Sequence, residues 1–289
     1  RTAKGKAMIN ILPIATGISI AALMPVDAPE EEWDNLQIVF ATSDGDVRQN
    51  DLSDFVNVKR NGKIAMNLPE GVFLVNAAIA DENDDVMLVT ALGRDIRFPT
   101  TEIRVFKSRG STGVRGIRVG AGDRVVSMSI IRHFEADPAE REAYLKQRRL
   151  MAGAIDDEVE ADEDEEAVAL GQLSTDRYAE MSAAEDLILT ITQSGSGKLS
   201  SSHDYPVRGR GGLGVKAMDG AMRGGPLVAS FPVEISDQIM LATSTGQSIR
   251  VPVDQISFRS RSAGGVKVFN VGADESVVSV ARVAEQADE

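Results

Sequence analysis

The sequence contains no cysteine and only two histidines, His133 and His203, among its 289 residues. The missing cysteines exclude disulfide bonds and zinc sites built from thiolates. Two histidines are too few for a histidine-rich metal centre, so carboxylate-bound magnesium or calcium is the only metal chemistry left open. A chain without cysteine fits a reducing compartment, and we therefore expect a cytoplasmic protein to which we assign no metal ligands.

No N-terminal signal peptide is visible in the sequence, and we expect no hydrophobic run in it to cross a bilayer. Its longest apolar stretch is residues 11–26, ILPIATGISIAALMPV, which Pro13, Gly17 and Pro25 interrupt. A membrane-spanning helix needs about 20 apolar residues in a row. We therefore expect no membrane partner and predict two short buried strands in this stretch.

Acidic charge is concentrated in one segment of the chain. The formal net charge is −13, and residues 135–186 alone hold 17 acidic and 5 basic residues. The rest of the chain is close to neutral. The composition of this segment is typical of a helix followed by a charged disordered tract, and we interpret it as an insertion. A decayed repeat unit is the alternative. Such a segment could be a passive linker or could compete with an anionic partner for basic surface.

Four stretches share apolar residues followed by the pattern Thr-x-x-Gly and then polar or basic residues. They are FATSDGDVRQ (40–49), VTALGRDIRF (89–98), TITQSGSGKL (190–199) and LATSTGQSIR (241–250). Glycine in this position supplies the positive φ that a tight turn requires. We predict a β-hairpin at each of them.

A second element follows each hairpin and combines Arg, Ser and Gly with a Gly-Val-basic triplet. Three copies are clear and two are looser: 105–119, 205–218 and 257–271, then 58–68 and 1–11. Their shared glycines are Gly5, Gly62, Gly113, Gly214 and Gly265. An apolar strand closes each unit, and the period is about 50 residues, which is typical of propeller-like blades.

These repeats predict one all-β domain over residues 1–289, built of four-stranded blades. The predicted units are a partial blade at 1–26, blades at 27–80, 81–134, 187–235 and 236–289, and the acidic insertion at 135–186.

Two glycine-rich motifs resemble nucleotide-binding loops, and we assign both to turns of the repeat. Residues 209–214 have the spacing G-x-G-x-x-G, but a dinucleotide fold needs this motif between a strand and a helix. Residues 194–200, SGSGKLS, have Leu199 where a phosphate loop needs Ser or Thr to bind magnesium. We therefore expect no cofactor in this chain.

The basic residues recur at the same place in every unit. If the repeat brings them to one rim, arginine and lysine there could hold the phosphates of duplex DNA, with glycine allowing close backbone approach. The alternative is that these bases only solvate exposed strand edges. The candidate DNA-binding residues are Arg1, Lys4, Lys6, Lys59, Arg60, Lys63, Lys107, Arg109, Arg115, Arg208, Arg210, Lys216, Arg259, Arg261 and Lys267.

Four stretches closely resemble the C-terminal domain of the DNA gyrase A subunit: RTAKGKAMINILPI, VMLVTALGRDIRF, STGVRGIRVGAGDRVVS and QIMLATSTGQSIRV. The resemblance implies a β-pinwheel, a propeller-like ring in which strands cross between neighbouring blades. It also implies that the domain wraps DNA around a basic rim and so supports ATP-dependent negative supercoiling. The implied partners are duplex DNA and, in an A2B2 holoenzyme, the ATPase B subunit together with the remainder of the gyrase A subunit.

The sequence departs from this family in one motif. The family carries a Gln-Arg-Arg-Gly-Gly-Lys-Gly box in its first blade, and this chain has only RGRGGLG (208–214) and QRRLMAG (147–153) as partial matches. We therefore interpret the chain as N-terminally truncated, beginning inside the second blade.

The resemblance places ATP, magnesium and the catalytic tyrosine elsewhere in the enzyme. We assign no catalytic residue and interpret the chain as a non-catalytic part of a larger enzyme. Two alternatives remain: the corresponding domain of topoisomerase IV, which selects a DNA segment without full wrapping, and a propeller-like module for protein interactions.

Overall fold

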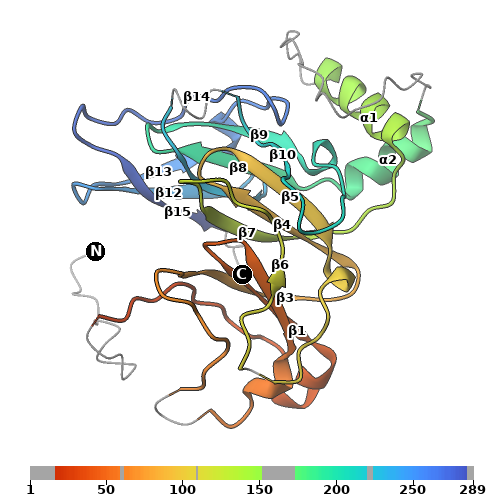
Figure 1. The fold of residues 1–289 in the computed structure, drawn as a ribbon. Helices are drawn as coiled ribbons and strands as arrows, with labels where there is room; N and C mark the ends of the chain where they lie inside the picture. Colours follow the sequence, from red (N-terminus) through yellow and green to blue (C-terminus); the bar gives the residue numbers. More distant parts are fainter. Residues whose placement is uncertain (1–16, 59–61, 109, 152–172, 220–223, 285–289) are drawn as a thin grey trace.

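The computed structural model describes residues 17–58, 62–108, 110–151, 173–219 and 224–284. Within them the chain forms four antiparallel sheets, which we number as blades 1 to 4 (Figure 1). Blade 1 has the strand order β3-β1-β2-β6, blade 2 β10-β5-β4-β7, blade 3 β11-β8-β9-β14 and blade 4 β13-β12-β15. The predicted all-β pinwheel is therefore confirmed.

The strand bounds follow the repeat in the sequence. Blade 1 contains β1 (Gln37–Thr42), β2 (Asp46–Asp51), β3 (Leu74–Ala80) and β6 (Val114–Arg115); blade 2 contains β4 (Asp84–Thr90), β5 (Arg94–Pro99), β7 (Val125–Arg132) and β10 (Val215–Lys216). Blade 3 contains β8 (Leu187–Thr192), β9 (Ser196–Ser201), β11 (Leu227–Val233) and β14 (Val266–Lys267); blade 4 contains β12 (Gln238–Thr243), β13 (Ser248–Pro252) and β15 (Val277–Val283).

The fourth strand of blades 1 to 3 comes from the next unit in the chain. β6, β10 and β14 belong to the second, third and fourth units, yet they pair with β2, β5 and β9 of the blade before. A contiguous stretch such as 27–80 therefore supplies three strands of its own blade, and the fourth strand comes from the next unit. Among the described residues, blade 4 receives no exchanged strand, so β13 forms its edge.

The inner edges of the blades meet one another in chain order. β3 packs beside β7, β7 beside β11, and β11 beside β15. In blades 1 to 3 the exchanged strand lies at the opposite edge of the sheet from these inner strands. The repeat therefore places every exchanged strand on the outer side of the assembly.

The four predicted hairpins are all present, and their glycines have the predicted conformation. Gly45, Gly93, Gly195 and Gly246 have φ between 76° and 91°. The hydroxyl of Thr42 accepts a hydrogen bond from the backbone N–H of Asp46 at 3.1 Å, and Thr192 holds Ser196 in the same way at 3.2 Å. The threonine hydroxyl and the glycine backbone conformation thus both stabilise the turn.

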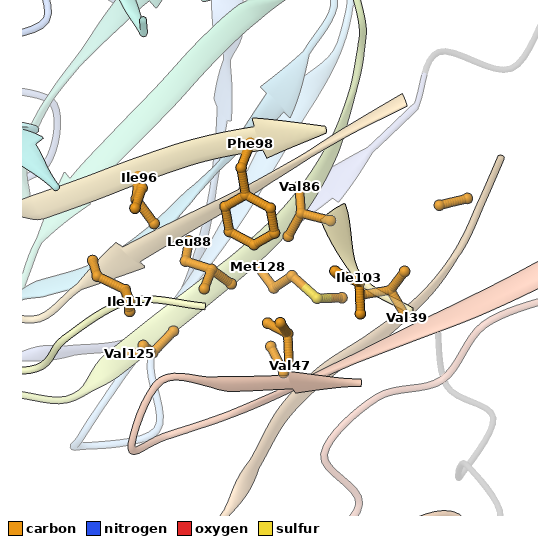
Figure 2. Packing of buried hydrophobic residues seen from close by; sticks show 12 residues of the cluster. Val39, Val47, Val86, Leu88, Ile96, Phe98, Ile103, Ile117, Val125 and Met128 are labelled. Atoms are coloured by element: carbon orange, nitrogen blue, oxygen red, sulfur yellow. The ribbon is translucent and has the colours of Figure 1, made fainter. Parts of the chain in front are cut away.

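The hydrophobic core lies between successive blades. Figure 2 shows the cluster between blades 1 and 2, where Val39 and Val47 face Leu88, Phe98 and Met128. Each of these side chains is at most 2% exposed. Similar clusters lie between blades 2 and 3 and between blades 3 and 4, so burial of this apolar surface fixes the order of the blades.

Over the part of the chain that the structure describes, five short 3-10 turns complete the blades. One, η2 (Glu30–Asn35), precedes β1; the others follow the outer strand of each hairpin and are η3 (Leu52–Phe55), η4 (Thr100–Glu102), η5 (Ser202–Asp204) and η6 (Val253–Gln255).

In its described residues the acidic insertion contains two helices, α1 (Pro138–Met151) and α2 (Thr175–Ala183), which stand out from the blades in Figure 1. The predicted helix is therefore present, and α2 is an additional helix. Tyr144 of α1 and Met181 of α2 are fully buried, and the Tyr144 ring packs edge-on to His203 of η5. The helices thus dock on blade 3, whereas the charged tract 152–172 lies outside the described residues.

The two buried strands predicted for residues 11–26 are absent from the described part, 17–26. Ile18, Ile20 and Leu23 are 65%, 46% and 78% exposed. In every blade the inner strand pairs with the first strand of the hairpin that precedes it. An apolar composition alone therefore does not produce a strand here.

Candidate nucleic-acid interface

The three clear copies of the glycine-rich element are residues 105–119, 205–218 and 257–271, which we call the exchanged segments. Their backbones are joined to one another as well as to the blades. The Arg118 N–H donates to the Gly212 carbonyl at 2.8 Å, and the Asp219 N–H, directly after the second segment, donates to the Ser262 carbonyl at 2.6 Å. The exchanged segments therefore form one continuous hydrogen-bonded belt along the outer side of the blades.

The glycines of the exchanged segments allow this close pairing. A Cβ atom on Gly113 would lie 2.4 Å from the Val47 carbonyl oxygen, and one on Gly214 would lie 2.1 Å from that of Asp95. Both glycines also have positive φ, 121° and 71°. We expected these glycines to let the backbone approach phosphates, but the described contacts show that they admit the neighbouring strand.

Several predicted DNA-binding residues lie outside the described residues. They are Arg1, Lys4, Lys6, Lys59, Arg60 and Arg109.

Besides Arg210, which is described below, three of the predicted cations have exposed side chains on the belt. Lys107 is 85% exposed and lies 3.1 Å from a carboxylate oxygen of Asp51. Arg115 is 45% exposed, and its Nε lies 3.1 Å from Asp46. Lys267 is exposed as well. Ion pairs this open to water contribute about 0–1 kcal/mol, so a phosphate could replace the carboxylate at little cost.

Two further predicted cations are half-buried on the second exchanged segment. Arg208 places its backbone N–H on the Arg97 carbonyl at 2.8 Å. Lys216 lies 3.8 Å from Asp219 through its ammonium group and retains 38% side-chain exposure. Both belong to the segment that pairs with blade 2.

Arg261 does not have the exposed position that we predicted. Its side chain is only 5% exposed; its Nε donates to the Asp204 carbonyl at 2.7 Å, and its Nη1 donates to the Lys216 carbonyl. Arg210 makes the equivalent bonds in the preceding unit but is exposed. These side chains hold backbone carbonyls because consecutive exchanged segments lie close enough for one arginine to bridge them.

Two more predicted cations also serve the fold. Lys63 donates from Nζ to the carbonyls of Asp54 and Val56. Arg259 is half-buried, and its backbone N–H donates to the Leu199 carbonyl at 2.8 Å. Sequence position alone could not separate these residues from the exposed cations, because both kinds lie beside the same glycines.

Arg94 and Arg118 are exposed cations that the sequence reasoning missed. Arg94 lies directly opposite Lys216 in the pairing of β5 with β10, so two cations face each other across the strands. The signal was available: Arg94 follows the hairpin glycine Gly93, at the position that Asp46 occupies in blade 1 and Ser196 in blade 3. Like charges directly opposite are unfavourable, and the Asp219 carboxylate 3.8 Å from the Lys216 ammonium group offsets part of this cost.

The residue opposite the exchanged cation therefore sets the local charge. In blade 1 the carboxylate of Asp46 offsets Arg115, and partial burial raises the pKa of Asp46 against the lowering effect of that arginine. In blade 2 both facing residues are cations, and Arg118 and Arg210 lie on the adjoining segments. Blade 2 thus has two cations at the position where blade 1 has an ion pair, with Asp219 3.8 Å from the Lys216 ammonium group.

No metal centre is available in the part of the chain that the structure describes, since it holds no group of three or more His, Cys, Asp or Glu residues that could bind an ion.

Comparison with known proteins identifies the family. The family described as "DNA gyrase C-terminal domain, beta-propeller" matches residues 37–81, 84–132, 186–225 and 237–284. The chain belongs to this family. The matched stretches are the four units, and the helical insertion falls between the second and third.

Curated relatives of this gyrase domain are DNA gyrase A subunits. That of Granulibacter bethesdensis is 47% identical over 98% of this chain, and that of Escherichia coli is 30% identical over 100% of it. The chain spans 31% and 27% of the length of these two relatives.

Solved structures share the fold of the gyrase domain at low sequence identity. The C-terminal domain of DNA topoisomerase IV superposes with a TM-score of 0.69 and 19% identity, covering 96% of this chain and 70% of that one. The C-terminal domain of DNA gyrase A gives a TM-score of 0.62 and 18% identity, covering 87% of this chain and 67% of that one.

Over the residues that are described, no helix is long and apolar enough to span a membrane.

Proposed function

We propose that this chain binds, bends and wraps duplex DNA without reading its sequence, as the C-terminal domain of a gyrase A subunit. The observation that carries the proposal is the continuous belt of exchanged segments with exposed cations on it. Phosphates are held by charge and by backbone N–H groups, whereas base reading needs side chains in a groove.

The composition of the belt favours a duplex over a single strand. Single-strand binding uses aromatic side chains on which bases stack, and the only aromatic residues of the exchanged segments are Phe106, Tyr205, Phe258 and Phe269, all of them buried or half-buried. Bending a short duplex by tens of degrees costs on the order of 1–6 kcal/mol. Phosphate contacts spread over three blades could supply this free energy.

Partners and location follow from this role. We propose that the domain works in the cytoplasm within an A2B2 enzyme, together with the remainder of the gyrase A subunit. The ATPase B subunit would be its other protein partner. Cleavage of DNA and hydrolysis of ATP would then belong to other parts of that assembly. The chain itself would need no cofactor.

A titration of a labelled duplex across salt concentrations tests DNA binding. We expect an affinity that falls steeply as salt increases, because bound phosphates release counterions. A complete lack of binding near about 50 mM salt, where such contacts are strong, would favour the protein-interaction module instead.

The topoisomerase IV role differs in wrapping, and the fold similarity to that enzyme's domain keeps it open. Relaxing a plasmid in the presence of the protein and then removing the protein reports any trapped writhe. A linking-number change that grows with protein concentration supports wrapping. Binding without a linking-number change supports segment selection.

A further inference from the structure

Arg210 makes three hydrogen bonds that leave the second exchanged segment in two directions. Its backbone N–H donates to Glu102 Oε2 at 2.8 Å, and its Nε donates to the Glu102 carbonyl at 2.9 Å. Its Nη1 donates to the carbonyl of Arg115 at 3.0 Å. One guanidinium thus touches both η4 and the first exchanged segment.

Arg261 repeats this arrangement one unit later. Its backbone N–H donates to Asp204 Oδ2 at 2.6 Å, and its Nε donates to the Asp204 carbonyl at 2.7 Å. Its Nη1 donates to the carbonyl of Lys216. The same three contacts on a 3-10 turn and a preceding exchanged segment mark this as a recurring joint of the repeat.

Each joint connects three consecutive blades. Arg210 belongs to the segment that pairs with blade 2, η4 follows the outer strand of blade 2, and Arg115 lies in β6 on blade 1. Since the segment carrying Arg210 comes from the third unit, the side chain ties the chain of blade 3 to blades 1 and 2. Arg261 does the same for blades 4, 3 and 2.

The carbonyls held by these arginines belong to residues with cationic side chains, the exposed Arg115 and the half-buried Lys216. Arg115 and Lys216 are both predicted phosphate contacts, and each is the residue whose backbone is gripped by the arginine of the next unit. The two joints therefore fix where the backbones of Arg115 and Lys216 lie relative to the next blade.

We propose that Arg210 and Arg261 are positioning residues that set the spacing of the rim cations, and so the path of bound DNA. This inference rests on the proposed DNA wrapping and reassigns two residues that the sequence suggested as direct phosphate contacts. Arginine suits the task because its planar fork can serve several acceptors at once, whereas lysine offers a single point charge.

The test compares Arg210→Lys and Arg261→Lys with Lys267→Gln as the matched control. The two arginine variants keep the positive charge but lose the branched guanidinium group that makes the joint. The control loses one exposed charge of the rim and leaves both joints intact. Two quantities are measured for each 289-residue protein. One is the affinity for a short duplex over a range of salt concentrations. The other is the fluorescence energy transfer between dyes at the two ends of that duplex when it is saturated with protein.

The arginine variants are expected to bind within about threefold of the unaltered protein with the same salt slope, since charge is kept. Their energy transfer at saturation should fall, reporting a straighter duplex. Lys267→Gln should reduce the salt slope by about 0.9, the value for one lost phosphate contact, with little change in energy transfer. Arginine variants that lose salt slope as the control does, or that keep the wild-type bend, would overturn the proposal.

Amide hydrogen exchange without DNA separates failure of the joint from failure of the proposed function. The amides of Arg118 and Asp219, which link adjacent segments, should exchange faster in the arginine variants by about tenfold or more, because local opening is easier once the joint is lost. The circular dichroism spectrum should match that of the unaltered protein. Unchanged exchange at both amides would contradict the joint even if the chain binds no DNA.

Discussion

The glycines of this protein act through contacts that lie at different distances along the chain. A hairpin glycine such as Gly246 has a local role, because the turn between two adjacent strands requires positive φ and no atom lies within 4 Å of where its Cβ would be. Gly214 has a non-local role, because the absence of a Cβ leaves room for the Asp95 carbonyl of another unit. The sequence could predict the first role and offered no means of seeing the second.

Replacing Gly214 with alanine should destabilise the domain by about 2–4 kcal/mol, since a side chain would be strained at positive φ and would collide with Asp95. Thermal or urea unfolding measures this loss. Gly209→Ala is the matched control: the nearest atom to its Cβ would be a flexible Glu102 oxygen 3.9 Å away. A Gly214→Ala protein as stable as the Gly209→Ala protein would show that the exchanged strand pairs differently.

Basic residues illustrate the same limit at the residue scale. Lys198 is fully buried in β9 and donates from Nζ to the carbonyls of Ser260, Arg261 and Ala263. Burial lowers its pKa to about 7. A lysine in a polar hairpin carried no sequence signal of this role, because the loop that it grips lies 62 to 65 residues later.

At the scale of whole elements, periodicity predicted the hairpins and the inner strands well. β1 to β2 and β4 to β5 are formed by adjacent residues with alternating polarity, so local pattern is sufficient for them. The exchanged strands β6, β10 and β14 are two residues long and pair across units. So short a motif can be recognised from its residue types, but they do not show which strand it pairs with.

The docking of α1 and α2 on blade 3 should depend on pH through His203. Its Nε2 lies 2.8 Å from the Met181 carbonyl of α2, and burial lowers its pKa below the ordinary value of 6.5. Below pH 6.5 the unfolded state therefore binds more protons than the folded state, and the free energy of unfolding falls as pH falls toward the lowered pKa.

Urea unfolding at about pH 7.5 and about pH 5.5, on either side of the ordinary histidine pKa, checks this. His203→Gln is the comparison, because both proteins retain His133. The unaltered protein should lose more stability on acidification than the variant does. An identical loss in the two proteins would show that His203 is not held in its neutral form.

At the scale of the whole molecule, charge is distributed unevenly. A net charge of −13 would argue against DNA as a partner if it were uniform, but residues 135–186 carry most of it. The belt on blades 1 to 3 is a separate surface whose cations come from three units. The sequence predicted such a rim. The structure adds that two of its arginines, Arg210 and Arg261, donate hydrogen bonds to backbone carbonyls of neighbouring segments.

Blade 2 should contribute to DNA affinity, because the exposed Arg94 lies there directly opposite a second cation, Lys216. Arg94→Gln is expected to weaken duplex binding by several-fold at about 50 mM salt. Lys146→Gln, which removes one exposed charge from α1, is the matched control. Equal affinities for the two variants would move the interface away from blade 2.

The salt dependence of duplex binding, measured for the unaltered chain and for the triple variant Arg94→Gln, Lys216→Gln, Lys267→Gln, tests the belt most directly. The account predicts a linear fall of log affinity with log salt, and a slope smaller by about 0.9 for each phosphate contact that the variant loses. Equal slopes for the two proteins would contradict it, since the exposed cations of the exchanged segments would then not hold the DNA.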